Sequence, residues 1–325
     1  MFKKFALCVV LLSSVLYSNP LVDLYRLHGI AAVEKELNKS LQDVNYWKSS
    51  LKGDDLRFGY ISDLEYVFLN QKSLNNLQVF KKDGKNYSKI FDEPVMIGQG
   101  NGDKQKEGDL KTPVGVYDLL RRNTQVDPFY GPLALITSYP NLYDISLGKN
   151  GHGIWIHGVP ESENRDEFTQ GCIAMENGRL LRLDSLIDHR KSVLLISEDK
   201  FVESNIDDIS ALFASIYGWQ HSWKVNDLET YMSFYDKDFI RIKKGGIRED
   251  YNFFKRYKKI IFDRNERKQI IFSNINIIPY PNVSNKKLFK IEMYQDYWAP
   301  SFQSSGKKIL YVELKNGKMS ILTES

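Results

Sequence analysis

The sequence predicts an α+β chain in three parts: a helical N-terminal segment, a β-rich central domain and an α+β C-terminal domain. Apolar residues recur at helical spacing between Leu21 and Leu41, and short apolar runs follow from about Leu74. Beyond Val202, two amphipathic helical patterns precede several longer strand patterns. A chain of 325 residues can form two or three domains. The boundaries we predict give segments 1–19, 20–70, 71–200 and 201–325.

The first 19 residues have the pattern of a signal peptide. Lys3 and Lys4 precede an apolar run from Phe5 to Leu16, which is short for a membrane span. The small-residue cleavage pattern after this run is imperfect, so an uncleaved anchor is the alternative. We therefore expect an exported protein of the periplasm or cell envelope.

Residues 20–65 are predicted to be helical. Pro20 suits a helix start, a shorter helix is predicted over residues 44–51, and Lys52 to Asp55 form a break. These helices could pack on the central domain, could join two copies of the chain as a homodimer, or could form an accessory bundle without a partner.

The central domain is predicted to consist of short strands with one or two helices. We predict strands at 77–80, 87–91, 95–97, 111–117, 134–137, 143–147 and 193–196, and a helix at 180–187. The glycine-rich run from Gly98 to Gly108 is a weak candidate for a nucleotide loop, because no apolar helix and no Gly-Lys-Ser/Thr follow it. We interpret it as a mobile loop.

The stretch with the most reactive side chains lies between Ile154 and Asn177. An apolar run ends at His157-Gly158, and a polar loop returns through Thr169-Gln170-Gly171 to Cys172. An imidazole that takes the thiol proton makes a cysteine nucleophilic. Gly171 lacks a Cβ and would allow close approach of a substrate. The amides of Gly171 and Cys172 could then hold the negative charge that develops on an attacked carbonyl.

Cysteine usage and a family resemblance support this interpretation over a structural role, which is the commoner role of a single Cys or His. The chain has 2 cysteines, and Cys8 lies in the predicted signal peptide, so Cys172 alone would enter an oxidising compartment. The order His-Gly, a gap, then Thr-x-Gly-Cys-Ile resembles the signature of the L,D-transpeptidase (YkuD-type) family. The run from Thr112 to Tyr117, Thr-Pro-x-Gly-x-Tyr, resembles an upstream part of that family, so the resemblance covers about residues 74–198.

The resemblance implies a cysteine enzyme that acts on the peptide stems of bacterial peptidoglycan. It implies that Cys172 is the nucleophile, that His157 is the general base, and that the Gly158 carbonyl orients the imidazole. Many family members have a histidine at the position of Gln170 and an arginine at that of Ala174. Without this arginine a ready partner for a substrate carboxylate is missing.

The replacement of this arginine by Ala174 favours an L,D-carboxypeptidase, which removes the terminal D-alanine from tetrapeptide stems. The alternatives are an L,D-transpeptidase, which transfers the acyl group to a second stem or a protein amine, and a peptidoglycan-binding module without catalysis.

The residues around the motif include further candidates. Substrate-binding candidates are Gly171, Gln170, Thr169, His152 and Ala174. A metal site could draw on His152, Glu161, Glu163 and Asp166, but no His-Glu-x-x-His is present, so we expect no metal and no other cofactor. His152 is better explained as a loop residue that lines the cleft.

The C-terminal part begins with two predicted helices, at 206–217 and 227–239. The pattern Asp227-Leu228-x-x-Tyr-x-x-Phe-Tyr resembles the opening helix of NTF2-like domains. Strands are predicted at 270–278, 287–294, 309–314 and 319–322, with a loop at 301–306. Because no His/Asp dyad is evident, we predict a binding or positioning role. The combination with a YkuD-type domain resembles L,D-carboxypeptidases that set helical cell shape.

Lys and Arg are frequent between Arg241 and Lys268, where they alternate with Tyr251, Phe254 and Tyr257. We predict a helix with an aromatic inner face and a basic outer face. The net charge of +4 is too small to indicate nucleic acid as a partner. In an exported protein, such a surface would more readily meet glycan or an anionic envelope polymer.

Overall fold

The computed structural model describes residues 19–161, 168–243 and 245–325. The predicted signal peptide with Cys8, and also Glu163 and Asp166, lie outside these described residues. The chain divides into two units, the first ending at Ser40 and the second running from Leu41 to Ser325. In the described part of the chain, no helix has both the length and the apolar character needed to cross a membrane.

The predicted N-terminal stripe forms two helices rather than one, α1 (Pro20–His28) and α2 (Ile30–Leu41). Gly29, with φ 76°, ends α1 and donates its N–H to the Tyr25 carbonyl. No side chain of either helix is buried. The short predicted helix is α3 (Val44–Ser50), whose Trp47 stacks on Phe213 with ring centroids 4.3 Å apart.

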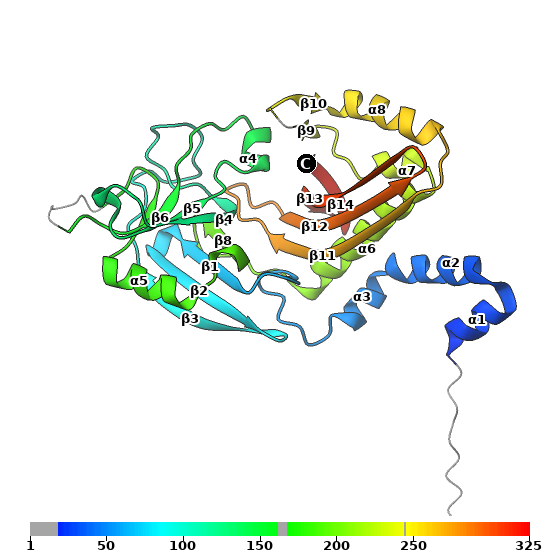
Figure 1. Cartoon of the computed structure of the whole chain (residues 1–325), viewed down its shortest axis with the longest axis horizontal. Coiled ribbons are helices and arrows are strands. Elements are labelled where there is room, and N and C mark those ends of the chain that lie inside the picture. Colours follow the sequence, from blue (N-terminus) through cyan, green and yellow to red (C-terminus); the bar gives the residue numbers. More distant parts are fainter. Residues whose placement is uncertain (1–18, 162–167, 244) are drawn as a thin grey trace, which may run out of the picture. The chain divides into compact units, whose positions relative to one another are not determined.

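The central domain is built on one eight-stranded sheet in the order β3-β2-β1-β8-β4-β5-β6-β7 (Figure 1). Its strands are β1 (Tyr66–Gln71), β2 (Asn76–Asp83), β3 (Asn86–Pro94), β4 (Gly115–Asn123), β5 (Ala134–Thr137), β6 (Trp155–His157), β7 (Ile173–Ala174) and β8 (Ser192–Ser197). The pairs β1–β8 and β6–β7 are parallel, and the others are antiparallel. The parallel pair at one edge, with Ile156 opposite Ile173, brings the predicted histidine and cysteine onto neighbouring chain segments.

Helices α4 (Leu142–Ser146) and α5 (Asn177–Leu186) complete the central domain, with three single 3₁₀ turns at Lys72–Leu74, Pro128–Tyr130 and His189–Lys191. The predicted strand at 143–147 is wrong. The side chain of Asn141 accepts from the Asp144 amide, and the Asp144 carboxylate accepts from the Asn141 amide, so this capping box starts α4 instead. The predicted strand at 95–97 contributes only a bridge from Met96 to Ala174, and β1 was not predicted.

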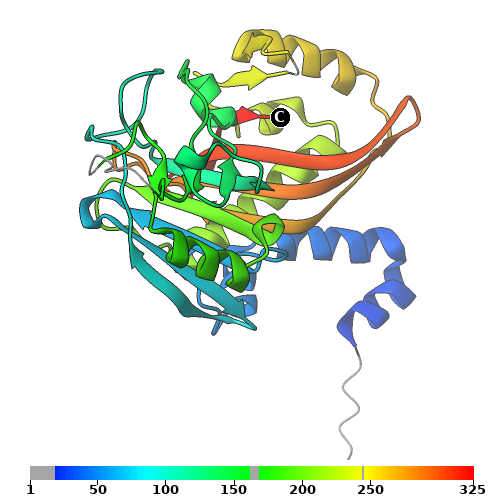
Figure 2. The same ribbon diagram turned by 60° about the vertical axis from the view of Figure 1, so that its left-hand side comes forward.

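The C-terminal domain pairs helices with a four-stranded antiparallel sheet (Figures 1 and 2). Its elements are α6 (Ile206–Lys224), α7 (Leu228–Met232), β9 (Ile240–Ile242), β10 (Arg248–Asp250), α8 (Tyr251–Asp263), β11 (Gln269–Pro279), β12 (Leu288–Ala299), β13 (Phe302–Lys315) and β14 (Lys318–Glu324). Helix α6 is longer than predicted and contains Trp219 and Trp223, whereas α7 is shorter. The predicted loop at 301–306 falls almost wholly within β13.

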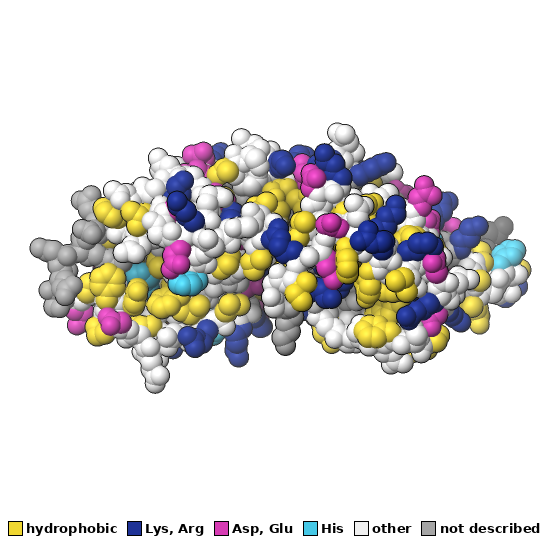
Figure 3. Space-filling view, turned by 90° about the horizontal axis from the view of Figure 1, so that it is seen from above, with side chains coloured by type: hydrophobic (Ala, Val, Ile, Leu, Met, Phe, Trp, Pro, Cys, Tyr) yellow, Lys and Arg dark blue, Asp and Glu magenta, His cyan; other side chains and the backbone are white. Residues whose placement is uncertain are grey.

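Helix α8 carries the basic surface that the sequence predicts, and Figure 3 shows Lys and Arg side chains gathered on this side of the molecule. Its inner face differs from the prediction. Phe254 is buried, but Tyr257 is largely exposed, and the other buried residues are Lys258 and Phe262. A lysine thus takes an inward position that we expected an aromatic residue to hold.

The central and C-terminal domains meet through a buried ion cluster. The Lys290 ammonium on β12 lies 2.6 Å from Asp118 on β4 and 2.5 Å from Glu292. Burial alone would lower the pKa of Lys290, but these carboxylates outweigh it, so its pKa is raised and the side chain stays charged.

Candidate active site

His157 ends β6 and is almost fully buried, with its Nδ1 2.7 Å from the carbonyl oxygen of Gly158. A carbonyl oxygen can only accept, so Nδ1 donates the proton and Nε2 is the basic nitrogen of the neutral ring. This is the contact that the family resemblance implies for Gly158. A Cβ at Gly158 would lie 2.2 Å from Asn177 Oδ1, so a larger residue in the turn would have to displace the Asn177 side chain.

Tyr130 holds the imidazole from its other side. The two rings meet edge to face with centroids 5.0 Å apart, and the Tyr130 carbonyl accepts the Gly158 N–H at 2.9 Å. One residue therefore fixes both the ring of His157 and the backbone turn that orients it. No motif in the sequence pointed to Tyr130, because it comes from a separate segment between β4 and β5.

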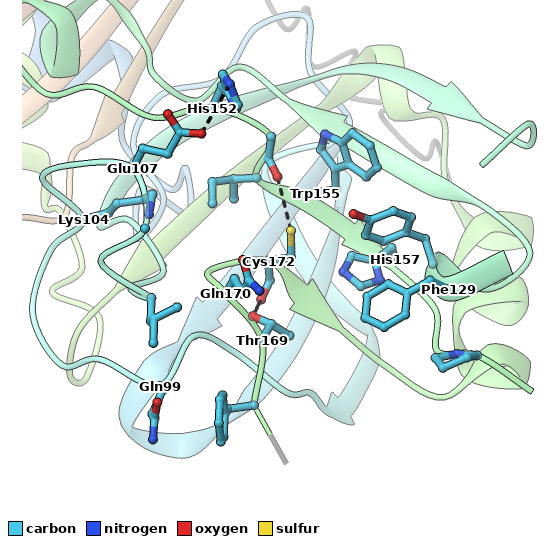
Figure 4. A pocket seen from close by; sticks show the side chains of 17 residues that line it. Gln99, Lys104, Glu107, Phe129, His152, Trp155, His157, Thr169, Gln170 and Cys172 are labelled. Atoms are coloured by element: carbon cyan, nitrogen blue, oxygen red, sulfur yellow. Dashed lines mark hydrogen bonds and ion pairs between the residues drawn. The ribbon is translucent and has the colours of Figure 1, made fainter. Parts of the chain in front are cut away.

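Cys172 immediately precedes β7 and is half-buried. Its thiol donates to the Gly153 carbonyl at 3.3 Å. Figure 4 shows the side chains of Cys172 and His157 facing the same cleft. Thiol and imidazole therefore face one space in which a substrate carbonyl can meet both groups.

The cleft has a volume of about 760 Å³ and is lined by residues from several segments. The lining residues include Gln99, Lys104, Glu107, Leu110, Phe129, Tyr130, His152, Trp155, His157, Phe168, Thr169, Gln170 and Cys172. Aromatic rings from Phe129, Trp155 and Phe168 give apolar surface, and Lys104 and Glu107 give charge. Phe129, Lys104 and Glu107 lie outside the stretch from Ile154 to Asn177, so no motif indicated that they line the cleft.

Thr169 closes the turn that carries the thiol. Its hydroxyl donates to the Cys172 carbonyl at 2.6 Å and accepts the Gly171 N–H at 3.0 Å, while its own N–H donates to the Ile97 carbonyl. The Gly171 amide is thus already engaged. The prediction that it helps to hold a developing oxyanion is wrong for this amide.

Gly171 is required by the protein's own backbone. It is buried, its φ is 131°, and a Cβ there would lie 2.6 Å from the Lys111 carbonyl oxygen. The Gly171 carbonyl in turn accepts from the Thr112 hydroxyl at 2.9 Å. The close approach that we expected with a substrate is therefore an approach to the segment before β4.

The other predicted substrate-binding residues divide into two groups. Gln170 and His152 line the cleft, and His152 lies 3.7 Å from Glu107, both being exposed. Ala174 does not line the cleft, because it is buried in β7 and pairs through its backbone with Met96. The predicted contact of Ala174 with substrate is therefore wrong. Among the described residues, no group of three or more His, Cys, Asp or Glu could hold a metal.

The loop between Gln99 and Lys111 forms one wall of the cleft and is held by charged groups, while its predicted mobility stays a prediction. The Asp109 carboxylate accepts from the Lys104 ammonium at 2.6 Å and from the backbone amides of Gln105, Lys106 and Lys111. Burial raises the pKa of Asp109, but these donors outweigh it and hold its pKa well below the usual range.

The interior of the C-terminal domain holds a second set of buried charges. The Lys258 ammonium lies over the Trp223 ring at 4.3 Å and near Tyr231 and Phe254. Burial lowers the pKa of Lys258 to about 7. Nearby, the buried Glu324 pairs with Lys308 at 3.0 Å.

Comparisons with known proteins agree with this arrangement. Residues 65–195 match the L,D-transpeptidase catalytic domain, YkuD, and residues 211–325 match the Cds6 C-terminal NTF2-like domain. The chain is 32% identical over 107 residues to YafK of Escherichia coli, a provisionally assigned L,D-transpeptidase. This match spans 33% of the chain and 40% of YafK.

Solved structures extend the likeness to nearly the whole chain. The helical cell shape determining protein Pgp2 from Campylobacter jejuni is 38% identical, with a TM-score of 0.81, over 87% of this chain and 99% of that chain. A point variant of Pgp2 gives a TM-score of 0.83 at the same identity, over 88% of this chain and 99% of that one. Bd1075 of Bdellovibrio bacteriovorus is 27% identical with a TM-score of 0.65, over 83% and 95% of the two chains. The chain therefore belongs to the YkuD-type L,D-transpeptidase family, in the group that joins this catalytic domain to a Cds6-type NTF2-like domain.

Proposed function

We propose that the chain is a peptidoglycan L,D-carboxypeptidase that trims tetrapeptide stems to tripeptides and takes part in cell-wall remodelling and cell shape. The observation that carries the proposal is the 2.7 Å contact between His157 Nδ1 and the Gly158 carbonyl. This contact leaves Nε2 as the base on a ring that faces the same cleft as the Cys172 thiol.

The reaction begins when Nε2 of His157 takes the proton of Cys172. The thiolate attacks the carbonyl that joins the L-centre of meso-diaminopimelate to the terminal D-alanine. When the tetrahedral intermediate collapses, the imidazolium protonates the leaving amine, D-alanine departs and a thioester remains. Water then gives a proton to Nε2 and attacks the thioester, which yields the tripeptide and restores the thiol.

The acceptor distinguishes this activity from the alternative within the family. If a second stem or a protein amine attacks the thioester in place of water, the product is a cross-link and the enzyme is an L,D-transpeptidase. The match to YafK favours this alternative. The combination of a YkuD-type domain with a Cds6-type NTF2-like domain, which resembles that of L,D-carboxypeptidases that set helical cell shape, supports hydrolysis.

Mass spectrometry of purified muropeptides, incubated with the wild type or with Cys172→Ala, tests the proposal. We expect conversion of tetrapeptide to tripeptide and free D-alanine by the wild type alone. New cross-linked dimers without tripeptide would establish the transpeptidase instead. If folded, reduced wild type changes neither substrate, the chain is better described as a peptidoglycan-binding module.

We propose that the C-terminal domain binds glycan or an anionic envelope polymer through its basic surface and that the N-terminal helices join two copies of the chain. The Lys and Arg side chains on the α8 side of the molecule support the first part (Figure 3). The exposed apolar residues of α1 and α2 support the second. Both roles fit action at the cell wall, in the periplasm or envelope.

A further inference from the structure

Lys149 joins three segments that surround the cleft. Its buried ammonium lies 2.7 Å from Asp144 on α4 and 2.5 Å from Asp103 in the loop that forms the cleft wall. The backbone that follows Lys149 leads directly to Gly153, whose carbonyl accepts from the Cys172 thiol. Asp103 also accepts the Val114 N–H at 2.9 Å. A buried lysine between two carboxylates therefore ties α4 to the loop and to the segment beside the thiol.

Helix α4 is held by the C-terminal domain at both ends. Arg248 on β10 donates to the carbonyls of Ile145 and Ser146, at 2.8 and 2.7 Å, where α4 ends. At the other end, the side-chain amide of Asn141 donates to the Tyr280 hydroxyl at 3.0 Å. Between them, Tyr143 stacks on Tyr311 with ring centroids 5.6 Å apart. The position of α4 is thus set largely by groups of the C-terminal domain.

The same loop is joined to the segment after α4 by two further hydrogen bonds. Asn150 accepts the Glu107 N–H at 3.0 Å through its side chain, and its own N–H donates to the Gln105 carbonyl at 3.2 Å. Glu107 lines the cleft, as do Lys104 and Leu110 of the same loop. A shift of α4 must therefore move the wall against which a substrate would lie.

We propose that the C-terminal domain positions the wall of the catalytic cleft through α4, with Arg248 and Lys149 as positioning residues. The contacts run from Arg248 to α4, from Asp144 to Lys149, and from Asp103 to the loop. For its effect on catalysis this inference rests on the proposed function, but the positioning itself can be measured without any substrate.

Amide hydrogen exchange of the full chain tests the positioning directly. Arg248→Ala removes both contacts to the end of α4, and we expect faster exchange at the amides of Gln105, Glu107 and Lys111. Arg256→Ala is the matched control, because Arg256 lies on α8 in the same domain and its guanidinium lies over the Phe253 ring. Equal exchange in the loop for wild type and Arg248→Ala would overturn the inference.

A second variant interrupts the link at its other end. In Asp103→Asn the amide oxygen can still accept from Val114, but the amide nitrogen would face the Lys149 ammonium, so the tie between loop and Lys149 is lost. We expect Arg248→Ala and Asp103→Asn each to raise KM for the tetrapeptide stem about three- to tenfold, with kcat changed less than about twofold. A loss of folded protein would instead lower kcat without changing KM.

The double variant decides whether the two residues act through one link. If they do, Arg248→Ala has little further effect on KM once Asp103→Asn is present, whereas independent effects multiply and contradict the inference. Arg248→Lys, which keeps a single donor nitrogen, should show a smaller change in KM than Arg248→Ala. If the wild type cleaves no stem at all, the proposed function fails, and the exchange experiment still decides the positioning.

Discussion

The Thr169 hydroxyl stabilises the turn that presents Cys172, since it accepts the Gly171 N–H and donates to the Cys172 carbonyl. Thr169→Val keeps the shape but removes both bonds. We predict that kcat falls at least tenfold, which corresponds to ~1.4 kcal/mol for a lost hydrogen-bonded turn. Kinetics with muropeptides measure this effect, and Thr169→Ser, which keeps the hydroxyl, should stay near the wild-type rate. A fully active Thr169→Val would show that the turn does not need the hydroxyl.

Burial of the Lys258 ammonium predicts a specific dependence of stability on pH. Its pKa is lowered from 10.5 to about 7 in the folded chain, so the unfolded chain binds more protons between these values. Stability therefore rises with pH across that window, and the cost of charging Lys258 is fully present below about pH 7. We predict that Lys258→Met is more stable than the wild type at pH 6 by about 1–3 kcal/mol.

Urea unfolding at pH 6 and pH 9 measures this difference. The gain of Lys258→Met over the wild type should shrink at the higher pH, where the native lysine is neutral. Lys255→Met, on the exposed face of the same helix, should show no such dependence. The same gain at both pH values would mean that packing, not protonation, causes the effect.

At the scale of single residues, the sequence could indicate the groups that we propose to react, but not their surroundings. Cys172 and His157 stand in a local motif, and the Gly158 carbonyl follows from its place in the motif. Tyr130 and Lys104 are brought to the cleft by the fold from distant segments. The role of Gly171 was misjudged because the Lys111 carbonyl that crowds it is 60 positions away in the chain.

The N-terminal helices present apolar surface, and their proposed pairing with a second copy can be tested. Ile30 and Leu37 lie seven residues apart on one face of α2 and are 67% and 44% exposed. We predict that Ile30→Glu with Leu37→Glu converts a dimer to a monomer in size-exclusion chromatography with light scattering. Lys35→Glu is the control. A wild type that is monomeric at all concentrations would contradict the proposed homodimer.

Helices and strands could be predicted where the local sequence pattern is strong. They could not be predicted where a capping interaction determines whether a segment is a helix or where a helix ends. Strand β5 follows from the apolar run at 134–137 and has the predicted bounds. Residues 143–147 alternate like a strand, but the Asn141–Asp144 capping box makes them helical. Gly29 likewise splits one apolar stripe into two helices, because a single left-handed residue outweighs a continuous pattern.

At the scale of the whole molecule, the buried Lys290 joins the two sheets. Lys290→Met would leave Asp118 and Glu292 without their central cation, and we predict a loss of about 3 kcal/mol in the free energy of unfolding. Lys307 contacts the same carboxylates but is 54% exposed, so Lys307→Met should cost less than about 1 kcal/mol. Chemical unfolding followed by fluorescence measures both variants. Equal losses would show that burial does not determine how much each lysine contributes to the free energy of unfolding.

The order of the eight strands could not be derived from the sequence. It places β8 between β1 and β4, and such pairings depend on contacts between distant segments rather than on local pattern. The contact between the two domains at Asp118, Lys290 and Glu292 could not be predicted either. Charged residues in strands normally indicate a side that faces solvent.

The contacts of Arg248 with α4 also act in the opposite direction. Coupling free energies are reciprocal. If the C-terminal domain stabilises the cleft wall, an occupied cleft stabilises the C-terminal domain by the same free energy. A stem analogue held in the cleft should therefore slow amide exchange in β10, far from any atom that it touches. The two domains then behave as one thermodynamic unit, because stabilising either domain also stabilises the other.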